Sequence, residues 1–113
     1  MNALDITRSG LQANKAHLAT SAHNTANVNT DGFAKQKTSQ QTRLQGGVSS
    51  IVDTVSLSDE AKSHAQDLEG PQNNVNLAEE TVHQIQAQKN FEQNAQVIRT
   101  QDQMQKTLID LIT

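Results

Sequence analysis

Residues 76–112 read NLAEETVHQIQAQKNFEQNAQVIRTQDQMQKTLIDLI, and this stretch decides the fold. It contains neither glycine nor proline, and Asn76 and Glu79 have the spacing of a cap that satisfies free amide hydrogens at a helix start. Apolar residues recur along it at helical spacing: Val82, Ile85, Phe91, Ala95, Ile98, Leu108 and Ile112. A helix of this length extends for roughly 50 Å. A lone small domain rarely needs such a rod, so we expect a pair of long helices.

The residues from about Ala3 to Ala26 predict the second helix. Leu4, Leu11 and Leu18 follow one another at intervals of seven, surrounded by small residues. Two interpretations fit this narrow apolar seam with small neighbours. It is either an ordinary amphipathic helix that covers a core, or one strand of a coiled coil that needs a partner helix.

Residues 23–33, HNTANVNTDGF, predict how this helix ends. Asn and Thr side chains bond to their own backbone and compete with the helix. An Asp-Gly pair supplies the positive φ of a tight reversal, and the phenylalanine can anchor the turn back onto a helix. The expected turn motif consists of Ala26, Asn27, Asn29, Thr30, Asp31, Gly32 and Phe33.

Two patterns imitate metal sites without completing them. The alternate Asn27, Asn29 and Asp31 before Gly32 resemble a calcium loop, but the first ligand is an amide and the twelfth position, which needs a glutamate, is Thr38. Glu80-x-x-His83 matches a di-iron motif, which also requires a second copy and two further glutamates from other helices. The N-terminal helix has no glutamate. We therefore expect no catalytic residue, no metal, no cofactor and no enzyme activity.

Between the helices, residues 34–73 read as a linker-like middle region. Residues 34–50 are polar and interrupted by Gly46-Gly47. Ile51, Val52, Val55 and Leu57 fit either one short strand or a cover over a helix surface. Residues 58–69 predict a short helix capped by Ser58 and stopped by Gly70-Pro71. The predicted organisation is thus 1–33 for the first helix and turn, 34–73 for the middle, and 74–113 for the last helix.

Composition supports an elongated fold and narrows the function. Aromatic residues make up 2% of the chain and hydrophobic residues 34%, so a compact core is hard to build. The net charge of −3 does not indicate a nucleic-acid partner, and there is no cysteine. The start MNALDITRSG is not a cleavable secretory signal, and no stretch is apolar enough to insert into a membrane. We expect an all-α, elongated helical hairpin or coiled coil with a short, partly irregular middle region.

Both ends of the chain resemble the bacterial flagellar rod and hook proteins. The N-terminal likeness lies in Ala26-Asn27-Val28-Asn29-Thr30-Asp31-Gly32-Phe33, preceded by a helix with Leu4, Ser9, Gly10 and Leu11. The C-terminal likeness lies in Asn74-Val75-Asn76-Leu77 and in a series of later positions: Glu79, Glu80, Ile85, Gln88, Phe91, Glu92, Asn94, Ala95, Ile98 and Thr100. The small proximal-rod subunits are the nearest likeness. The family commonly has proline where Asp31 stands, and the middle region is shorter here.

The resemblance implies a structural subunit of the flagellar basal body rod. Its terminal helices would pack as coiled coils into a tubular axial polymer in the periplasm, and it would be exported by the flagellar type III apparatus without a cleavable signal peptide. Its partners would be other copies of itself and neighbouring axial proteins. The alternative is a non-flagellar coiled-coil adaptor that binds one partner helix. The candidate assembly seam consists of Leu4, Leu11, Leu18, Val82, Ile85, Phe91, Ala95, Ile98, Leu108 and Ile112.

Overall fold

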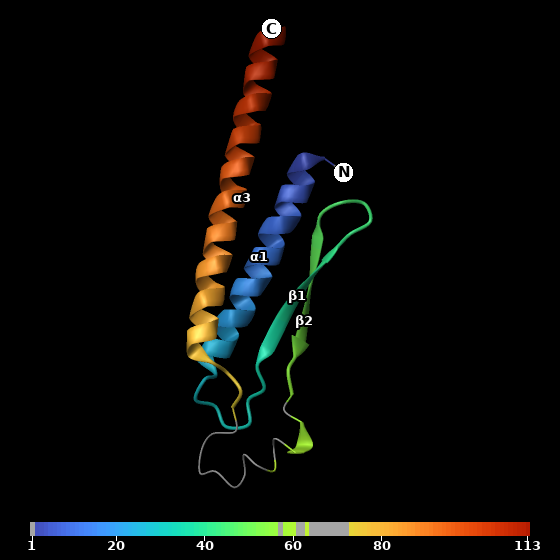
Figure 1. Ribbon diagram of the computed structural model, residues 1–113. Coiled ribbons are helices and arrows are strands. Elements are labelled where there is room, and N and C mark those ends of the chain that lie inside the picture. Colours follow the sequence, from blue (N-terminus) through green and yellow to red (C-terminus); the bar gives the residue numbers. More distant parts are fainter. Residues whose placement is uncertain (1, 57, 61–62, 64–72) are drawn as a thin grey trace.

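The computed structural model describes residues 2–56, 58–60, 63 and 73–113 of the chain. Its elements are α1 (Ala3–Ala26), β1 (Gln36–Thr42), β2 (Val48–Thr54) and α3 (Leu77–Ile112). α1 lies between α3 on one side and the β1–β2 hairpin on the other, and α3 continues well beyond the start of α1 (Figure 1). The molecule is a rod that measures 74 × 26 × 14 Å.

The two long helices confirm the prediction and are antiparallel. α1 has 24 residues and α3 has 36, which corresponds to about 54 Å for α3. Asn76 caps α3, since its side-chain oxygen accepts from the backbone N–H groups of Ala78 at 3.0 Å and Glu79 at 3.3 Å. At the start of α1, the Asp5 carboxylate accepts from the Asn2 N–H at 3.4 Å. Both caps satisfy amides that have no partner inside the helix.

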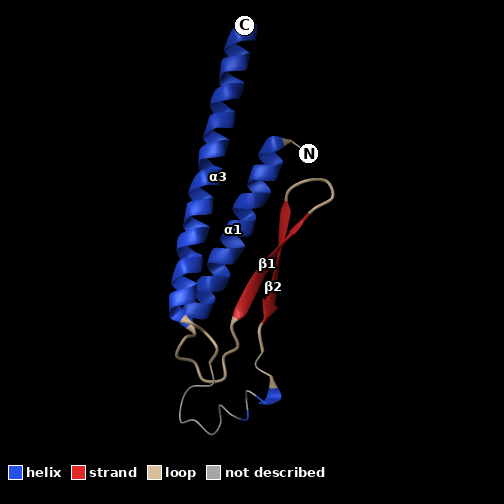
Figure 2. Ribbon diagram, in the orientation of Figure 1, coloured by secondary structure: helices blue, strands red, loops and turns tan. Residues whose placement is uncertain are grey.

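The all-α prediction is wrong, because the middle region contains an antiparallel hairpin (Figure 2). The strands pair from Gln36 opposite Thr54 to Thr42 opposite Val48. Residues 43–47 make the connection, in which Gly46 and Gly47 have φ values of 93° and 82°. The two glycines therefore turn the chain rather than merely interrupting it.

The strand alternative for the apolar part of the middle region is confirmed. Ile51 and Val52 belong to β2, and the Val55 N–H continues the pairing by donating to the Lys35 carbonyl at 2.8 Å. Leu57, and most of the short helix predicted over 58–69 with its Gly70-Pro71 stop, lie outside the described residues.

The hairpin is attached to α1 mainly by polar contacts. The Asn24 side chain accepts from the Gln36 N–H and donates to the Gln36 carbonyl, both at 2.8 Å. The Val48 N–H donates to Ser9 Oγ at 3.1 Å, and the Thr38 hydroxyl donates to that of Thr20 at 2.8 Å. These polar contacts are the physical reason why the all-α prediction failed. A strand held by polar side chains does not need the alternating apolar and polar residues by which a strand is recognised in a sequence.

The described part of the chain has almost no apolar core. Ala13 and Ala87 are its only buried hydrophobic side chains. The other buried side chains are polar or charged: Ser9, Asn14, Thr20, Ser21, Asn24 and Glu80. Because apolar burial is the main favourable term in folding, such an interior gives little stability to an isolated chain.

Candidate assembly interface

The predicted turn motif does end α1. The helix stops at Ala26, and Asn27 follows as the C-cap with its N–H bonded to the carbonyls of His23 and Asn24. Asn27 also bonds Thr30 twice, through its carbonyl to the Thr30 N–H at 3.0 Å and through its side-chain oxygen to the Thr30 hydroxyl at 3.2 Å. These local bonds replace the helical ladder, as expected for Asn and Thr.

Residues 30–33 form a tight turn closed by the Phe33 N–H, which donates to the Thr30 carbonyl at 3.3 Å. Gly32 has a φ of 71°, which confirms the expected positive value, whereas Asp31 has a negative φ. A positive φ at the third position alone defines a type II turn, in which proline is favoured at the second position. Phe33 packs edge-on against the His23 ring at a centroid distance of 5.4 Å, so the turn is anchored on α1.

Asn73 and Asn74 tie this turn to the hairpin and to the start of α3. The Asn73 side chain donates to the carbonyls of Asn27 at 2.6 Å and Thr30 at 2.9 Å. The Asn74 side chain accepts from the Lys35 N–H at 2.6 Å and donates to the Val55 carbonyl at 2.8 Å. Two consecutive asparagines thus hold three separate segments in place. The sequence predicted no role for Asn73.

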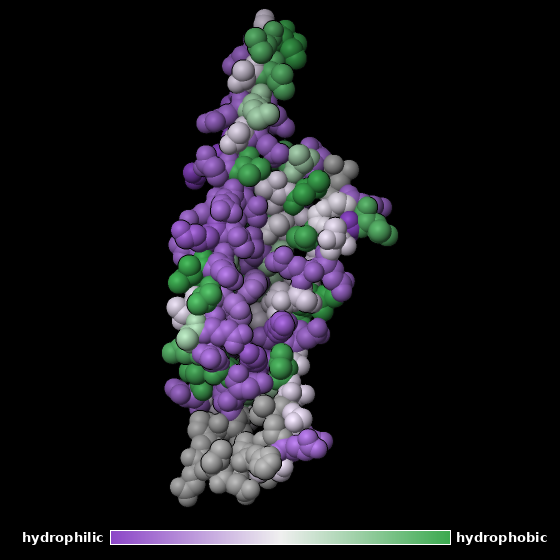
Figure 3. Space-filling view, in the orientation of Figure 1, coloured by the Kyte–Doolittle hydropathy of each residue, from purple (hydrophilic) through white to green (hydrophobic). Residues whose placement is uncertain are grey.

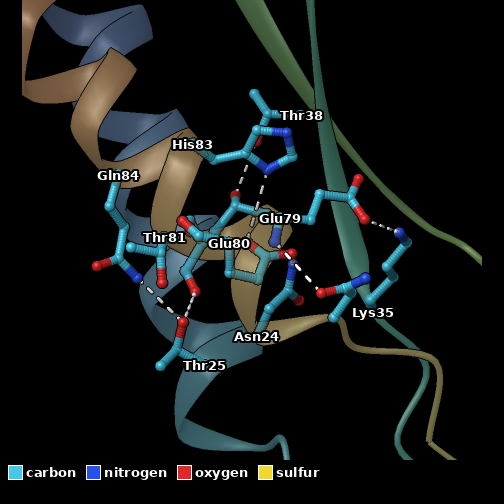
Figure 4. A network of polar contacts seen from close by, with 12 residues as sticks. Asn24, Thr25, Lys35, Thr38, Glu79, Glu80, Thr81, His83 and Gln84 are labelled. Atoms are coloured by element: carbon cyan, nitrogen blue, oxygen red, sulfur yellow. Dashed lines mark hydrogen bonds and ion pairs between the residues drawn. The ribbon is translucent and has the colours of Figure 1, made fainter.

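A buried carboxylate lies where α1, α3 and the hairpin meet (Figure 4). Glu80 is 2% exposed, and its Oε1 accepts from Asn24 Nδ2 at 3.0 Å. The Ser21 hydroxyl donates to the Glu80 backbone carbonyl at 3.0 Å, and Gln84 Nε2 donates to Thr25 Oγ1 at 3.0 Å. Because burying a carboxylate is costly unless it is bonded, Asn24 is the residue on which this cluster depends.

Two histidines lie beside the carboxylate. His83 Nδ1 is 3.7 Å from Glu80 Oε2, which has no hydrogen-bond partner among the described residues. The His17 and His83 rings are 5.3 Å apart. With Lys37 and neighbouring hydroxyls these residues line a cavity of about 80 Å³. Burial lowers the pKa of His17 below its ordinary 6.5, the adjacent His83 lowers it further, and Glu80 acts in the opposite direction. The folded structure therefore disfavours protonation of His17.

Among the residues that the structure describes, no group of three or more His, Asp or Glu side chains is arranged to hold a metal ion. Within the same residues, no helix combines the length and the apolar character that crossing a membrane requires.

The candidate seam residues fall into three groups. Leu4, Leu11, Ala95 and Ile98 are half-buried. Leu18 and Phe91 line an open groove between the helices. Val82, Ile85, Leu108 and Ile112 are exposed. Gly10 lies against Asn94, one turn before Ile98.

Small and polar side chains, rather than the large seam residues, carry the closest contact between α1 and α3. On α3, Glu80 and Ala87 are buried, and the half-buried Asn94 and Gln101 continue the same seven-residue spacing. On α1 the close approach occurs at Gly10, where an added Cβ would lie 3.1 Å from Asn94 Nδ2. A search for seven-residue spacing that included polar residues would have found the α3 series.

The large apolar side chains are left on the surface. In the described part of the chain, 15 large hydrophobic side chains are exposed, and 10 of them are on α3. The free end of α3 forms an apolar patch in the space-filling view (Figure 3). Exposed patches of this kind mark interaction surfaces.

Two family models match the chain, one on each long helix. Residues 4–33 match the model described as flagella basal body rod protein. Residues 72–111 match the model described as flagellar basal body rod FlgEFG protein C-terminal. Together they cover α1 with its turn and α3 with its cap, which are the two regions that carry the resemblance found in the sequence.

Curated relatives agree with these matches. The flagellar hook protein FlgE of Salmonella typhimurium is 35% identical over 84 residues, which cover 74% of this chain and 20% of that protein. The hook protein FlgE of Escherichia coli K12 is 53% identical over 38 residues, or 34% of this chain and 10% of that protein. The chain thus spans at most about a fifth of the length of these relatives. Family models match segments at both ends of the chain, and the chain belongs to the family of flagellar rod and hook proteins.

Proposed function

We propose that the chain is a structural subunit of the flagellar basal body rod, in which its terminal helices pack against those of neighbouring copies to form a tubular axial polymer. The observation that carries this proposal is the combination of family membership with a fold whose described residues include two buried alanines and 15 exposed large hydrophobic side chains. Such a molecule gains most of its apolar burial from neighbours rather than from itself.

The energetics favour assembly over an isolated chain. Full burial of a Val, Leu, Ile, Phe or Met side chain contributes about 1.5–3 kcal/mol. The exposed seam residues Val82, Ile85, Leu108 and Ile112 retain 52–83% of their accessible surface, so most of that contribution is still available. Packing of several such residues per subunit offsets the entropy lost when the helices are ordered.

The polar residues of α3 suit the same environment. Eight glutamines lie between residues 84 and 105. A helix in a polymer has neighbours on several sides, where an unpaired charge is costly to bury. Glutamine can both donate and accept hydrogen bonds. Within this chain, Gln84 donates to Thr25 Oγ1 and Gln88 donates to Glu92 Oε1. Glutamine can therefore satisfy contacts with a neighbour at a smaller desolvation cost.

The short middle region leaves little of the chain between the two matched segments. Residues 34–71 are all that separates the two matched segments. Assembly contacts must then come from the helices and the hairpin. This proposal places the subunit in the periplasmic rod after export by the flagellar type III apparatus without a cleavable signal. Its partners are further copies and neighbouring axial proteins, with no nucleic acid, membrane insertion, cofactor or catalytic role.

The proposal is tested by isolating basal bodies from a strain in which a tagged copy is the only source of this chain. We expect the tag in the purified rod fraction and a loss of motility when the gene is deleted. The alternative is a coiled-coil adaptor that binds one partner helix and stops at a closed complex. A tag that stays in the cell in a 1:1 complex, with normal swimming after deletion, would favour that alternative.

A further inference from the structure

Two apolar surfaces of the chain are unoccupied in its described part, and they lie at different heights of the rod. The first is the α3 tail, residues 106–112. Its side chains Leu108, Ile109, Leu111 and Ile112 are 58–83% exposed. It is also the part of α3 that extends beyond α1 (Figure 1).

The second surface is the interhelix groove, which has a volume of about 350 Å³. Leu18 from α1 and Ala87 and Phe91 from α3 supply its apolar lining, with Lys15 and Gln88 among its polar residues. A cavity of about 150 Å³ lined by similar side chains can hold a benzene molecule. The groove therefore has room for about two aliphatic side chains.

We propose that the interhelix groove of one copy receives the α3 tail of the next copy, so that copies stack head to tail along the axis. This inference rests on the proposed function and specifies one of its contacts. From Gln88 in the groove to Asp110 in the tail there are 22 residues of α3, which places successive copies about 30 Å apart. The tail then runs parallel to the α3 that it contacts.

The charges select this pairing over symmetric ones. In the tail, Lys106 forms an ion pair with Asp102, four residues earlier on α3, at 3.2 Å. Asp110 is therefore the tail's one charged side chain outside that pair. Neither Asp110 nor Lys15 has an ion-pair partner among the described residues. Tail against groove brings Asp110 toward Lys15. Tail against tail would bring two Asp110 carboxylates together, and groove against groove two Lys15 ammonium groups.

The pairing also has the symmetry that a polymer needs. The tail and the groove are different surfaces, so their contact is heterologous and can extend into an open stack. A contact between two identical surfaces would stop at a dimer. The last subunit at one end of the stack keeps a free tail, and the last subunit at the other end keeps a free groove. The stack can therefore grow.

Because the chain has no cysteine, disulfide formation can test the contact directly. The variants are Leu18→Cys in the groove and Leu111→Cys in the tail, one of them carrying a tag that changes its size. We expect little crosslinking of either variant alone, at least tenfold more of the mixed dimer when they are combined, and a ladder of multimers from the double variant. Gln86→Cys, at an exposed position of α3 outside the candidate seam, the groove and the tail, replaces Leu111→Cys in the control mixture.

A charge exchange sharpens the test. Lys15→Glu in the groove variant should reduce the mixed dimer severalfold, and Asp110→Lys in the tail variant should restore it. Dimers from either single variant alone, or equal crosslinking with Gln86→Cys, would overturn the head-to-tail contact. Each sample is also sedimented. If the wild-type protein forms polymer but the Leu18→Cys and Leu111→Cys variants do not crosslink, this inference alone is overturned. If the wild-type protein forms no polymer, the proposed function is overturned with it.

Discussion

Replacing Asn24 by alanine should destabilise the fold more than any other single truncation on α1. The side chain is 1% exposed and makes three hydrogen bonds, two with the Gln36 backbone and one with the Glu80 carboxylate. A bond to a charged group contributes about 1.5–3 kcal/mol and each neutral bond about 0.5–1.5 kcal/mol. Because water can reach Gln36 once the side chain is removed, we expect a total loss of about 3–5 kcal/mol. For a small domain this is a large part of the whole stability.

The assay is urea denaturation of dilute protein, followed by far-ultraviolet circular dichroism. Asn29→Ala is the matched control, since Asn29 is exposed and makes no side-chain hydrogen bond with the described residues. The control should change the unfolding free energy by less than about 0.5 kcal/mol. If Asn24→Ala is as stable as Asn29→Ala, Asn24 does not hold the helices and hairpin together, and the reasoning fails.

Other substitutions test three separate parts of the structure. Gly32→Val should lower the free energy of unfolding by about 1–2 kcal/mol because of the positive φ alone, since an added Cβ there has no atom within 4 Å. Asp31→Pro should be neutral or stabilising. Denaturation midpoints measure both effects. The lowered pKa of His17 means that the unfolded chain binds more protons, so stability should fall as the pH drops below about 6.5, and His17→Gln should flatten this decline between pH 7 and 5. A cell whose only copy carries Ile98→Asp should export the protein but not swim, while the exposed Gln103→Ala should swim normally; swimming of both variants would show that Ile98 is not in the assembly contact.

The long helices could be predicted because their signals are local. A stretch without glycine or proline and a cap at Asn76 fix α3 regardless of what packs against it. The Asp31-Gly32 turn is equally local, since only glycine adopts its φ without strain. That Phe33 packs back onto a helix followed from the same reasoning, whereas its partner His23 did not.

The hairpin and the polar cluster depend on partners that are distant in sequence. β1 reads QKTSQQT, and nothing in those letters shows that Gln36 will bond Asn24 on both sides of its backbone. Glu80 was considered as part of a metal motif, but its actual partner is an asparagine 56 residues earlier. A pattern based on hydrophobicity alone could not find an interface made by Ser21, Asn24 and Glu80.

The most direct test of the account is electron microscopy of the purified protein at increasing concentration, alone and with its neighbouring axial proteins. We predict open helical or tubular assemblies that lengthen with concentration and are absent from the Ile98→Asp variant. A closed dimer that stays the same size at every concentration, with or without axial neighbours, would contradict the central claim that this chain builds a flagellar axis through its terminal helices.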